Sequence, residues 1–127
     1  MSEIFDAFRE SGARRQVEPS LRFLADDVRL FASLTSKPFE GKEAVIAVFA
    51  MLLEVFDELE YVAEYDRPQG KVILTTGTVG GKAVDGIQVL ILDTNVFIRE
   101  FRDFIRLFSG AVALREAAER YLERHQP

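Results

Sequence analysis

An aspartate stands in an apolar row near the end of the chain. Between Phe97 and Leu107 the residues alternate in type, as in a β-strand, where successive side chains point to opposite faces. Asp103 shares its side of this strand with four apolar residues: Phe97, Phe101, Ile105 and Leu107. Because burial disfavours the charged form of a carboxyl, the pKa of Asp103 should lie above its usual range. General acid or base catalysis near neutral pH uses such a group.

Two other interpretations of Asp103 stay open. Its carboxyl could accept hydrogen bonds from a neighbouring hydroxyl or backbone group, or a bulge could turn it toward water. The apolar row favours a position on the wall of a pocket. Catalysis is a narrower hypothesis, because it also needs a second polar group within reach of the same substrate.

Gln88 is the first candidate for that second group. It interrupts an apolar row that contains Leu90 and Leu92, and its amide could donate a hydrogen bond to a bound molecule. A glutamine that is satisfied by backbone or water is the alternative. With Asp103 as the base and Gln88 as the donor, the two residues would form the minimal pair for removing a proton next to a carbonyl group.

Hydroxyl and aromatic side chains are further candidates for ligand contact. Tyr61 and Tyr65 lie on one side of a predicted strand, which would place their hydroxyls near a pocket, although core packing explains them more simply. Thr76 could line the same cavity, but threonine is common in strands for other reasons. The predicted ligand-binding residues are Gln88, Tyr61, Tyr65, Thr76 and Phe101.

The composition excludes several kinds of chemistry. The chain has no cysteine, which excludes disulfide scaffolds, thiol nucleophiles and thiolate metal sites. Its single histidine is His125, near the end of the chain. We therefore expect no metal and no cofactor. A net charge of −5 argues against nucleic-acid binding. No apolar run reaches the ~18 residues of a membrane span. We expect a cytoplasmic protein, because the lack of cysteine fits that compartment and Met1–Glu3 lacks a signal-peptide pattern.

The spacing of apolar residues predicts helices first and strands afterwards, in one α+β domain over residues 1–127. The first helix should end at Gly12. The two glycines Gly80 and Gly81 predict a hairpin turn, and Ser109 should cap the last helix. The predicted helices are 4–11, a short stretch from 19, 42–56 and 111–124, and the predicted strands are 28–31, 59–65, 71–79, 82–92 and 97–107. The strand 82–92 is apolar on both sides, so we expect it to be covered on both faces.

The order of several motifs resembles the nuclear transport factor 2-like superfamily, and within it the SnoaL-like polyketide-cyclase branch. The motifs are Phe23–Val28, the Phe-x-Gly-x-x-Ala turn in Pro38–Val45, and the strands Gly77–Ile87 and Ile98–Phe104. The resemblance implies a cone, in which a curved antiparallel sheet wraps around the long helix and leaves an apolar pocket open at one end. It also implies a homodimer through the convex face of the sheet. Members range from steroid isomerases to binding modules, so the fold alone does not give the function.

The catalytic residues of those members are mostly replaced in this chain. The segment Phe101–Phe104 resembles the aromatic-Arg-Asp-aromatic strand of limonene epoxide hydrolase-like members, in which the Asp faces the cavity. Their second Arg-x-Asp pair falls on Gly86 and Gln88 here. The base and the oxyanion-hole acid of the steroid isomerases fall on Ala32 and Gln88. The resemblance therefore carries over only Asp103 as a candidate catalytic residue.

Three functions follow from the sequence, and the cavity distinguishes them. A protein that binds a small apolar molecule would have an open pocket with one carboxylate. An acid–base enzyme of isomerase, cyclase or epoxide-hydrolase type, using Asp103, would add a second polar group that converges on the same space. A dimeric protein-interaction module would have a cone filled by its own side chains. The sequence favours the first of these.

Overall fold

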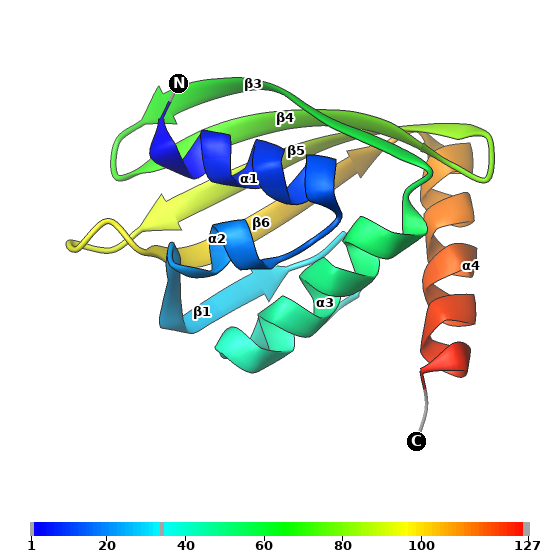
Figure 1. Cartoon of the computed structure of the whole chain (residues 1–127), viewed down its shortest axis with the longest axis horizontal. Coiled ribbons are helices and arrows are strands. Elements are labelled where there is room, and N and C mark those ends of the chain that lie inside the picture. The colour runs from blue at the N-terminus through cyan, green and yellow to red at the C-terminus, as the bar shows by residue number, and fades with distance from the viewer. Residues whose placement is uncertain (1, 34, 126–127) are drawn as a thin grey trace.

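Three helices cover one face of a six-stranded sheet, and a fourth helix crosses its end (Figure 1). The structure is a computed structural model that describes residues 2–33 and 35–125. Helices α1 (Glu3–Arg14), α2 (Glu18–Leu21) and α3 (Lys42–Val55) cover the sheet, and α4 (Phe108–Arg124) crosses the end. The strands are β1 (Leu24–Phe31), β2 (Phe39–Glu40), β3 (Glu58–Arg67), β4 (Gly70–Val79), β5 (Lys82–Leu92) and β6 (Ile98–Arg106).

The sheet is curved and mixed, with the strand order β2-β1-β6-β5-β4-β3. Strands β3 to β6 form the antiparallel meander that the sequence predicts. Strand β1 runs parallel to β6, with Leu30 opposite Phe101, so the sheet is not antiparallel throughout. The α+β cone with a long helix inside it is confirmed.

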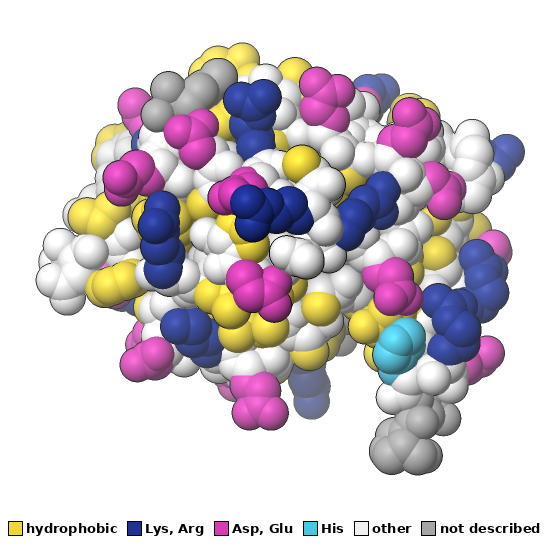
Figure 2. Space-filling model, in the orientation of Figure 1, with side chains coloured by type: hydrophobic (Ala, Val, Ile, Leu, Met, Phe, Trp, Pro, Cys, Tyr) yellow, Lys and Arg dark blue, Asp and Glu magenta, His cyan; other side chains and the backbone are white. Residues whose placement is uncertain are grey.

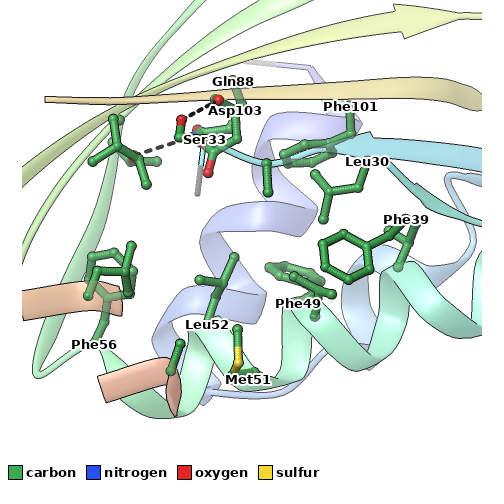
Figure 3. Close-up of a pocket in the computed structure, with 18 of the residues that line it drawn as sticks. Leu30, Ser33, Phe39, Phe49, Met51, Leu52, Phe56, Gln88, Phe101 and Asp103 are labelled. Atoms are coloured by element: carbon green, nitrogen blue, oxygen red, sulfur yellow. Dashed lines mark hydrogen bonds between the residues drawn. The ribbon is translucent and has the colours of Figure 1, made fainter. Parts of the chain in front are cut away.

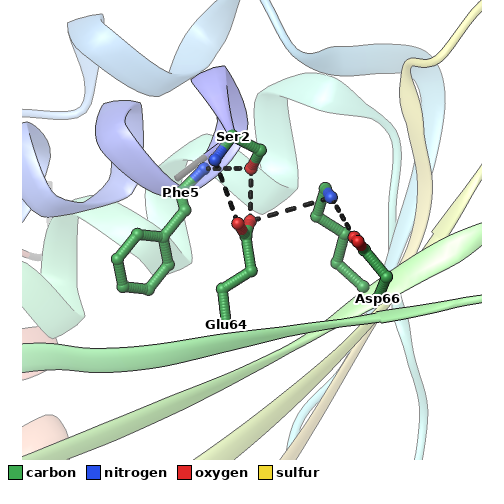
Figure 4. Close-up of polar contacts among 5 residues, drawn as sticks. Ser2, Phe5, Glu64 and Asp66 are labelled. Carbon is green, nitrogen blue, oxygen red and sulfur yellow. Dashed lines mark hydrogen bonds and ion pairs between the residues drawn. The ribbon is translucent and has the colours of Figure 1, made fainter.

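Helix α1 begins at Ser2, whose hydroxyl accepts a hydrogen bond from the amide of Phe5 at 3.2 Å. The amide of Ser2 donates to Glu64 on β3 at 3.0 Å, and Glu64 lies 3.8 Å from Lys71, which also pairs with Asp66 at 2.5 Å (Figure 4). This polar cluster fixes the start of α1 on the meander.

The predicted end of the first helix at Gly12 is wrong. The helix continues to Arg14 and ends at Arg15, which has a φ of 58°. A Cβ atom at Gly12 would lie 3.1 Å from the ring of Tyr61, so this glycine allows close packing and does not end the helix. The side chain of Arg15 also contacts the end of α3. Its guanidinium donates hydrogen bonds to the backbone oxygens of Leu53, Phe56 and Asp57.

Positive-φ glycines stand where the turns require them. Gly80 and Gly81, at 56° and 78°, form the β4–β5 turn, as predicted. Gly41, at 93°, directly precedes α3 within the Phe-x-Gly-x-x-Ala motif. The helix predicted over 42–56 is observed at Lys42–Val55, and the glycine allows its sharp departure from β2.

Strand β6 contains a bulge that the alternation of its residues does not reveal. The pairing with β5 shifts between Ile91 and Leu92, so that Ile98 is buried and Phe97 is 42% exposed. Phe97 therefore does not belong to the buried side of the strand, contrary to the prediction. Ser109 does not cap the last helix either, since α4 begins at Phe108 without a side-chain cap.

The outer face of the sheet is open in the single chain. Ile87 on β5 and its partner Phe104 on β6 are 43% and 56% exposed. The prediction that β5 is covered on both faces is therefore wrong for one copy of the chain. Figure 2 shows the opposite side of the molecule, that of the helices, where acidic and basic side chains are interspersed around smaller hydrophobic areas.

Candidate functional site

A cavity of about 240 Å³ lies between the inner face of the sheet, α3 and α4 (Figure 3). Helix α3 gives it an apolar wall that includes Val48, Phe49 and Leu52. These side chains are only half-buried, whereas Val45 and Leu53 on the same helix are fully buried. The wide apolar stripe of this helix thus faces a hollow as well as the core.

The sheet places its polar side chains at one end of this cavity. Asp103 on β6 lines it beside Phe101, and Gln88 on β5 lies directly opposite Asp103 in the strand pairing. Thr75 on β4 and Tyr61 on β3 line the same space. Four neighbouring strands therefore each contribute one side chain to a polar cluster inside an apolar chamber.

Gln88 connects the polar residues. Its Nε2 donates to Asp103 Oδ1 at 3.0 Å and to Thr75 Oγ1 at 3.3 Å, and these bonds use both of its amide protons. Its Oε1 is buried and has no hydrogen-bond partner among the described residues. Gly86 makes room for this arrangement, because a Cβ there would lie 2.5 Å from Thr75 Oγ1 and 2.8 Å from Gln88 Nε2.

Burial changes the proton affinity of two of these groups. Loss of contact with water raises the pKa of Asp103, and the hydrogen bond from Gln88 offsets part of that rise. Burial also raises the pKa of Tyr61, and the negative charge of Asp103 raises it further. Tyr61 is therefore a neutral hydroxyl near neutral pH, able to donate a hydrogen bond into the chamber.

Two predicted ligand contacts lie outside the cavity. The β3–β4 pairing shifts between Tyr61 and Ala63, and this bulge reverses the alternation of β3. Tyr65 is consequently 57% exposed on the outer face. Thr76 is also on the outer face, where its hydroxyl donates to Asp85 at 3.1 Å.

Thr75 is the inner residue that the sequence prediction missed. Its neighbours on the same side of β4, Ile73 and Val79, are both buried, so the alternation of that strand contained the signal. The prediction took the other side of the strand, with Thr76, as the side that lines the cavity. Gln88, Tyr61 and Asp103 do lie together on the inner face.

The mouth of the chamber is formed by α4 and by the segment after β1. Arg115 and Glu119 on α4 lie 3.8 Å apart at this mouth, and both are exposed. The Ser33 hydroxyl donates to the backbone oxygen of Asp103 at 2.6 Å. Near the other end of α4, Arg124 lies 3.5 Å from Glu54 on α3.

Clusters of metal-ligating side chains and long apolar helices are both absent from the residues that the structure describes. No group of three or more His, Asp or Glu residues in 2–33 and 35–125 is placed to hold a metal ion. None of the described helices combines the length and the apolar character that crossing a membrane would require.

No protein-family model matches the chain, and no curated protein matches its sequence. Solved structures do match. An uncharacterized bacterial protein with a cystatin-like fold from Silicibacter pomeroyi is 22% identical with a TM-score of 0.89, over 98% of this chain and 89% of that one. A steroid delta-isomerase from Pseudomonas aeruginosa is 24% identical with a TM-score of 0.86, over 98% of this chain and 95% of that one.

A SnoaL-like protein of unknown function from Burkholderia thailandensis is 14% identical, with a TM-score of 0.69 over 81% of this chain and 91% of that one. An NTF-2 like protein of unknown function from Burkholderia xenovorans has a TM-score of 0.71 at 10% identity, over 81% of this chain and 80% of that one. Identities this low establish the fold and leave the activity open. The chain therefore shares the fold of nuclear transport factor 2-like and SnoaL-like proteins of known structure.

Proposed function

We propose that the chain binds a small, mainly apolar molecule in the chamber, with one polar group of that molecule against Asp103. The observation that carries this function is an open cavity of about 240 Å³ whose walls are apolar except at the end that holds Asp103 and Gln88 and at the mouth, where Arg115 and Glu119 lie. A protein-interaction module would have filled this space with its own side chains. Pockets of this kind commonly bind small molecules, with a few polar groups that set the orientation.

A cavity-filling variant tests this function. Ala118 faces the chamber from α4, so Ala118→Phe should occupy part of its volume. The probe is 1-naphthalenemethanol, a neutral bicyclic alcohol, with binding followed by calorimetry. We expect the wild type to bind it and Ala118→Phe to bind at least about tenfold more weakly, a loss of ~1.4 kcal/mol.

The matched control places the same side chain outside the chamber. Ala47 is exposed on α3 and does not line the cavity, so Ala47→Phe should bind the alcohol like the wild type. Equal binding by the wild type and Ala118→Phe, or absence of binding to the wild type of both this alcohol and its amine counterpart, would contradict the proposed function.

Proton transfer is a second candidate, supported by two groups that face one cavity. Asp103 has a pKa raised by burial, as a general base near neutral pH requires, and Tyr61 offers a neutral hydroxyl. In this reaction Asp103 would take a proton from the carbon beside a ketone, and Tyr61 would donate a hydrogen bond to the enolate oxygen. Asp103 would then return the proton to the far carbon of a neighbouring double bond, so that atoms and electrons balance.

In this alternative Gln88 positions the base, since both of its amide protons are already used by Asp103 and Thr75. The solved steroid delta-isomerase that shares the fold makes ketone isomerisation a reasonable first assay. The substrate for the test is 3-cyclohexenone, whose conversion to the conjugated ketone is followed by ultraviolet absorbance. We expect Asp103→Asn to abolish turnover and Tyr61→Phe to lower kcat by about 10²-fold. No turnover by the wild type would reject this candidate and leave ligand binding intact.

A further inference from the structure

The polar end of the chamber holds hydrogen-bond acceptors without a matching cation. Asp103 accepts one bond, from Gln88, and takes part in no ion pair among the described residues. Gln88 is only 8% exposed, and its Oε1 is buried without a partner. A buried acceptor that lacks a donor costs free energy. The Asp103 carboxylate and Gln88 Oε1 are therefore available to a ligand that brings donors.

The rest of the chamber does not supply the missing charge. Among the described residues that line the cavity, Arg115 is the one basic residue, and it pairs with Glu119 at the mouth. The other groups that face the Asp103 side chain are the amide of Gln88 and the hydroxyl of Tyr61, and Ser33 contacts only its backbone. An anionic ligand would therefore meet a carboxyl and no free cation.

Aromatic rings lie next to this acidic end. The centroid of the Phe8 ring lies 5.8 Å from the ring centroid of Phe49 and 5.9 Å from the ring centroids of both Tyr61 and Phe101. Phe101 stands two residues before Asp103 on the same side of β6, and Figure 3 shows both at the chamber wall. The faces of aromatic rings attract cations, and most strongly where water is excluded.

We propose that the chamber selects a cationic amine: an apolar body carrying a single ammonium group, whose N–H donors bind the Asp103 carboxylate and Gln88 Oε1. This inference rests on the proposed function, since it names the class of molecule that the chamber would bind. Three properties of the ammonium match the site. It supplies the absent charge, it brings more than one donor, and it favours aromatic neighbours.

Ion pairing also explains why a carboxyl is stable at this position when the ligand is bound. Burial raises the pKa of Asp103, so the empty chamber disfavours the carboxylate. A bound ammonium would favour the carboxylate again, because an opposite charge at close range stabilises the ionised form. A neutral alcohol of the same shape gains no such stabilisation.

Two ligands of one shape test this inference. 1-Naphthylmethylamine and 1-naphthalenemethanol differ in the ammonium alone, and both are titrated into the wild type at about pH 8, where a primary amine keeps its proton. We expect the amine to bind at least about tenfold more tightly than the alcohol. Asp103→Asn should weaken the amine at least about tenfold and so remove this preference.

The controls separate this site from general attraction to an acidic protein. Asp85→Asn removes one negative charge from the outer face of the same sheet and should keep the preference for the amine. Gln88→Met removes the free Oε1 and should weaken the amine more than the alcohol. Should the alcohol bind as tightly as the amine, or should Asp85→Asn act like Asp103→Asn, the amine inference is overturned while the proposed function stands. If neither ligand binds the wild type, the proposed function fails with it.

Discussion

Two aspartates on neighbouring strands meet opposite surroundings because the sheet has two faces. Asp85 on β5 points outward, where Arg106 lies 3.0 Å away and Thr76 donates to it at 3.1 Å. Asp103 on β6 points inward, where its partner is the neutral amide of Gln88. The same side chain is thus a solvated member of an ion pair on one face and an isolated acid in an apolar chamber on the other.

The face of the sheet on which a carboxylate lies therefore decides whether it is available for chemistry. Outside, water and a cation compensate the charge, and such exposed pairs contribute little to stability. Inside, neither is present to the same degree, so the acid keeps its capacity to bind a ligand or a proton. Predictions that compare the two faces therefore test the site directly.

Substitutions at the apolar centre of the outer face should change the behaviour of the protein most. Leu74, Ile87 and Phe104 form one row across β4, β5 and β6, and the latter two are exposed. We expect a second copy of the chain to cover this row, because exposed apolar patches mark association surfaces. The double variant Ile87→Glu/Phe104→Glu should convert a dimer into a monomer, measured by analytical ultracentrifugation.

A matched control uses an exposed phenylalanine elsewhere. Phe108 at the start of α4 is 86% exposed, and Phe108→Glu should leave the dimer intact. A wild type that sediments as a monomer at high concentration would show that the outer face is not an interface between copies.

The second effect concerns room on the inner face. Gly86→Val would push a side chain against Thr75 and Gln88, with a Cβ that meets their polar atoms at 2.5 Å and 2.8 Å. We expect the free energy of unfolding to fall by about 1–3 kcal/mol, as is usual for overpacking. The measurement is urea unfolding, with Ala83→Val, an exposed position on the same strand, as the control. An equal loss of unfolding free energy in Gly86→Val and Ala83→Val would mean that side chains are not packed more tightly on the inner face than on the outer face.

The third effect is a pH dependence. Because burial raises the folded-state pKa of Asp103, its contribution to stability is fully present below its unfolded pKa of ~3.9 and is lost as the pH rises through the folded value. Asp103→Asn has no carboxyl that titrates at this position. Its free energy of unfolding relative to the wild type should therefore increase as the pH rises from about 4 to about 8, by ~1.4 kcal/mol for each pH unit that separates the folded from the unfolded pKa of Asp103.

Urea unfolding of both proteins at a series of pH values measures this difference. Asp85→Asn serves as the control on the outer face, where we expect a change of less than about 1 kcal/mol. A constant difference between Asp103→Asn and the wild type over the whole range would show that Asp103 is not held in an apolar environment.

The sequence was sufficient for the parts of the fold that depend on regular alternation. The pattern of β6 placed Asp103 and Phe101 on one side, and the glycines Gly80 and Gly81 marked the hairpin. The apolar stripe of α3 predicted a covered helix. It did not reveal that part of the stripe faces a cavity, because a core and an apolar pocket require the same residue types.

The sequence failed where one extra residue changes the register. The bulge between Tyr61 and Ala63 turns Tyr65 outward, and the bulge in β6 exposes Phe97. A bulge depends on how two strands pair in space, and a single strand's pattern does not contain that information. The link from Gln88 to Thr75 joins two strands that pair without a bulge, and the pattern of either strand alone does not show which residues of the other it meets.

The smallest effect belongs to the cation of the outer ion pair. Arg106 and Asp85 have side chains that are 71% and 41% exposed, so water already compensates both charges. Arg106→Gln should lower the free energy of unfolding by no more than about 1 kcal/mol, and added salt should reduce even this loss by screening. Urea unfolding at low and high salt, in the wild type and in the Ile87→Glu/Phe104→Glu background, measures the effect. A loss above ~2 kcal/mol that salt leaves unchanged would place this pair in a dry environment, and the contrast between the two faces of the sheet would then be wrong.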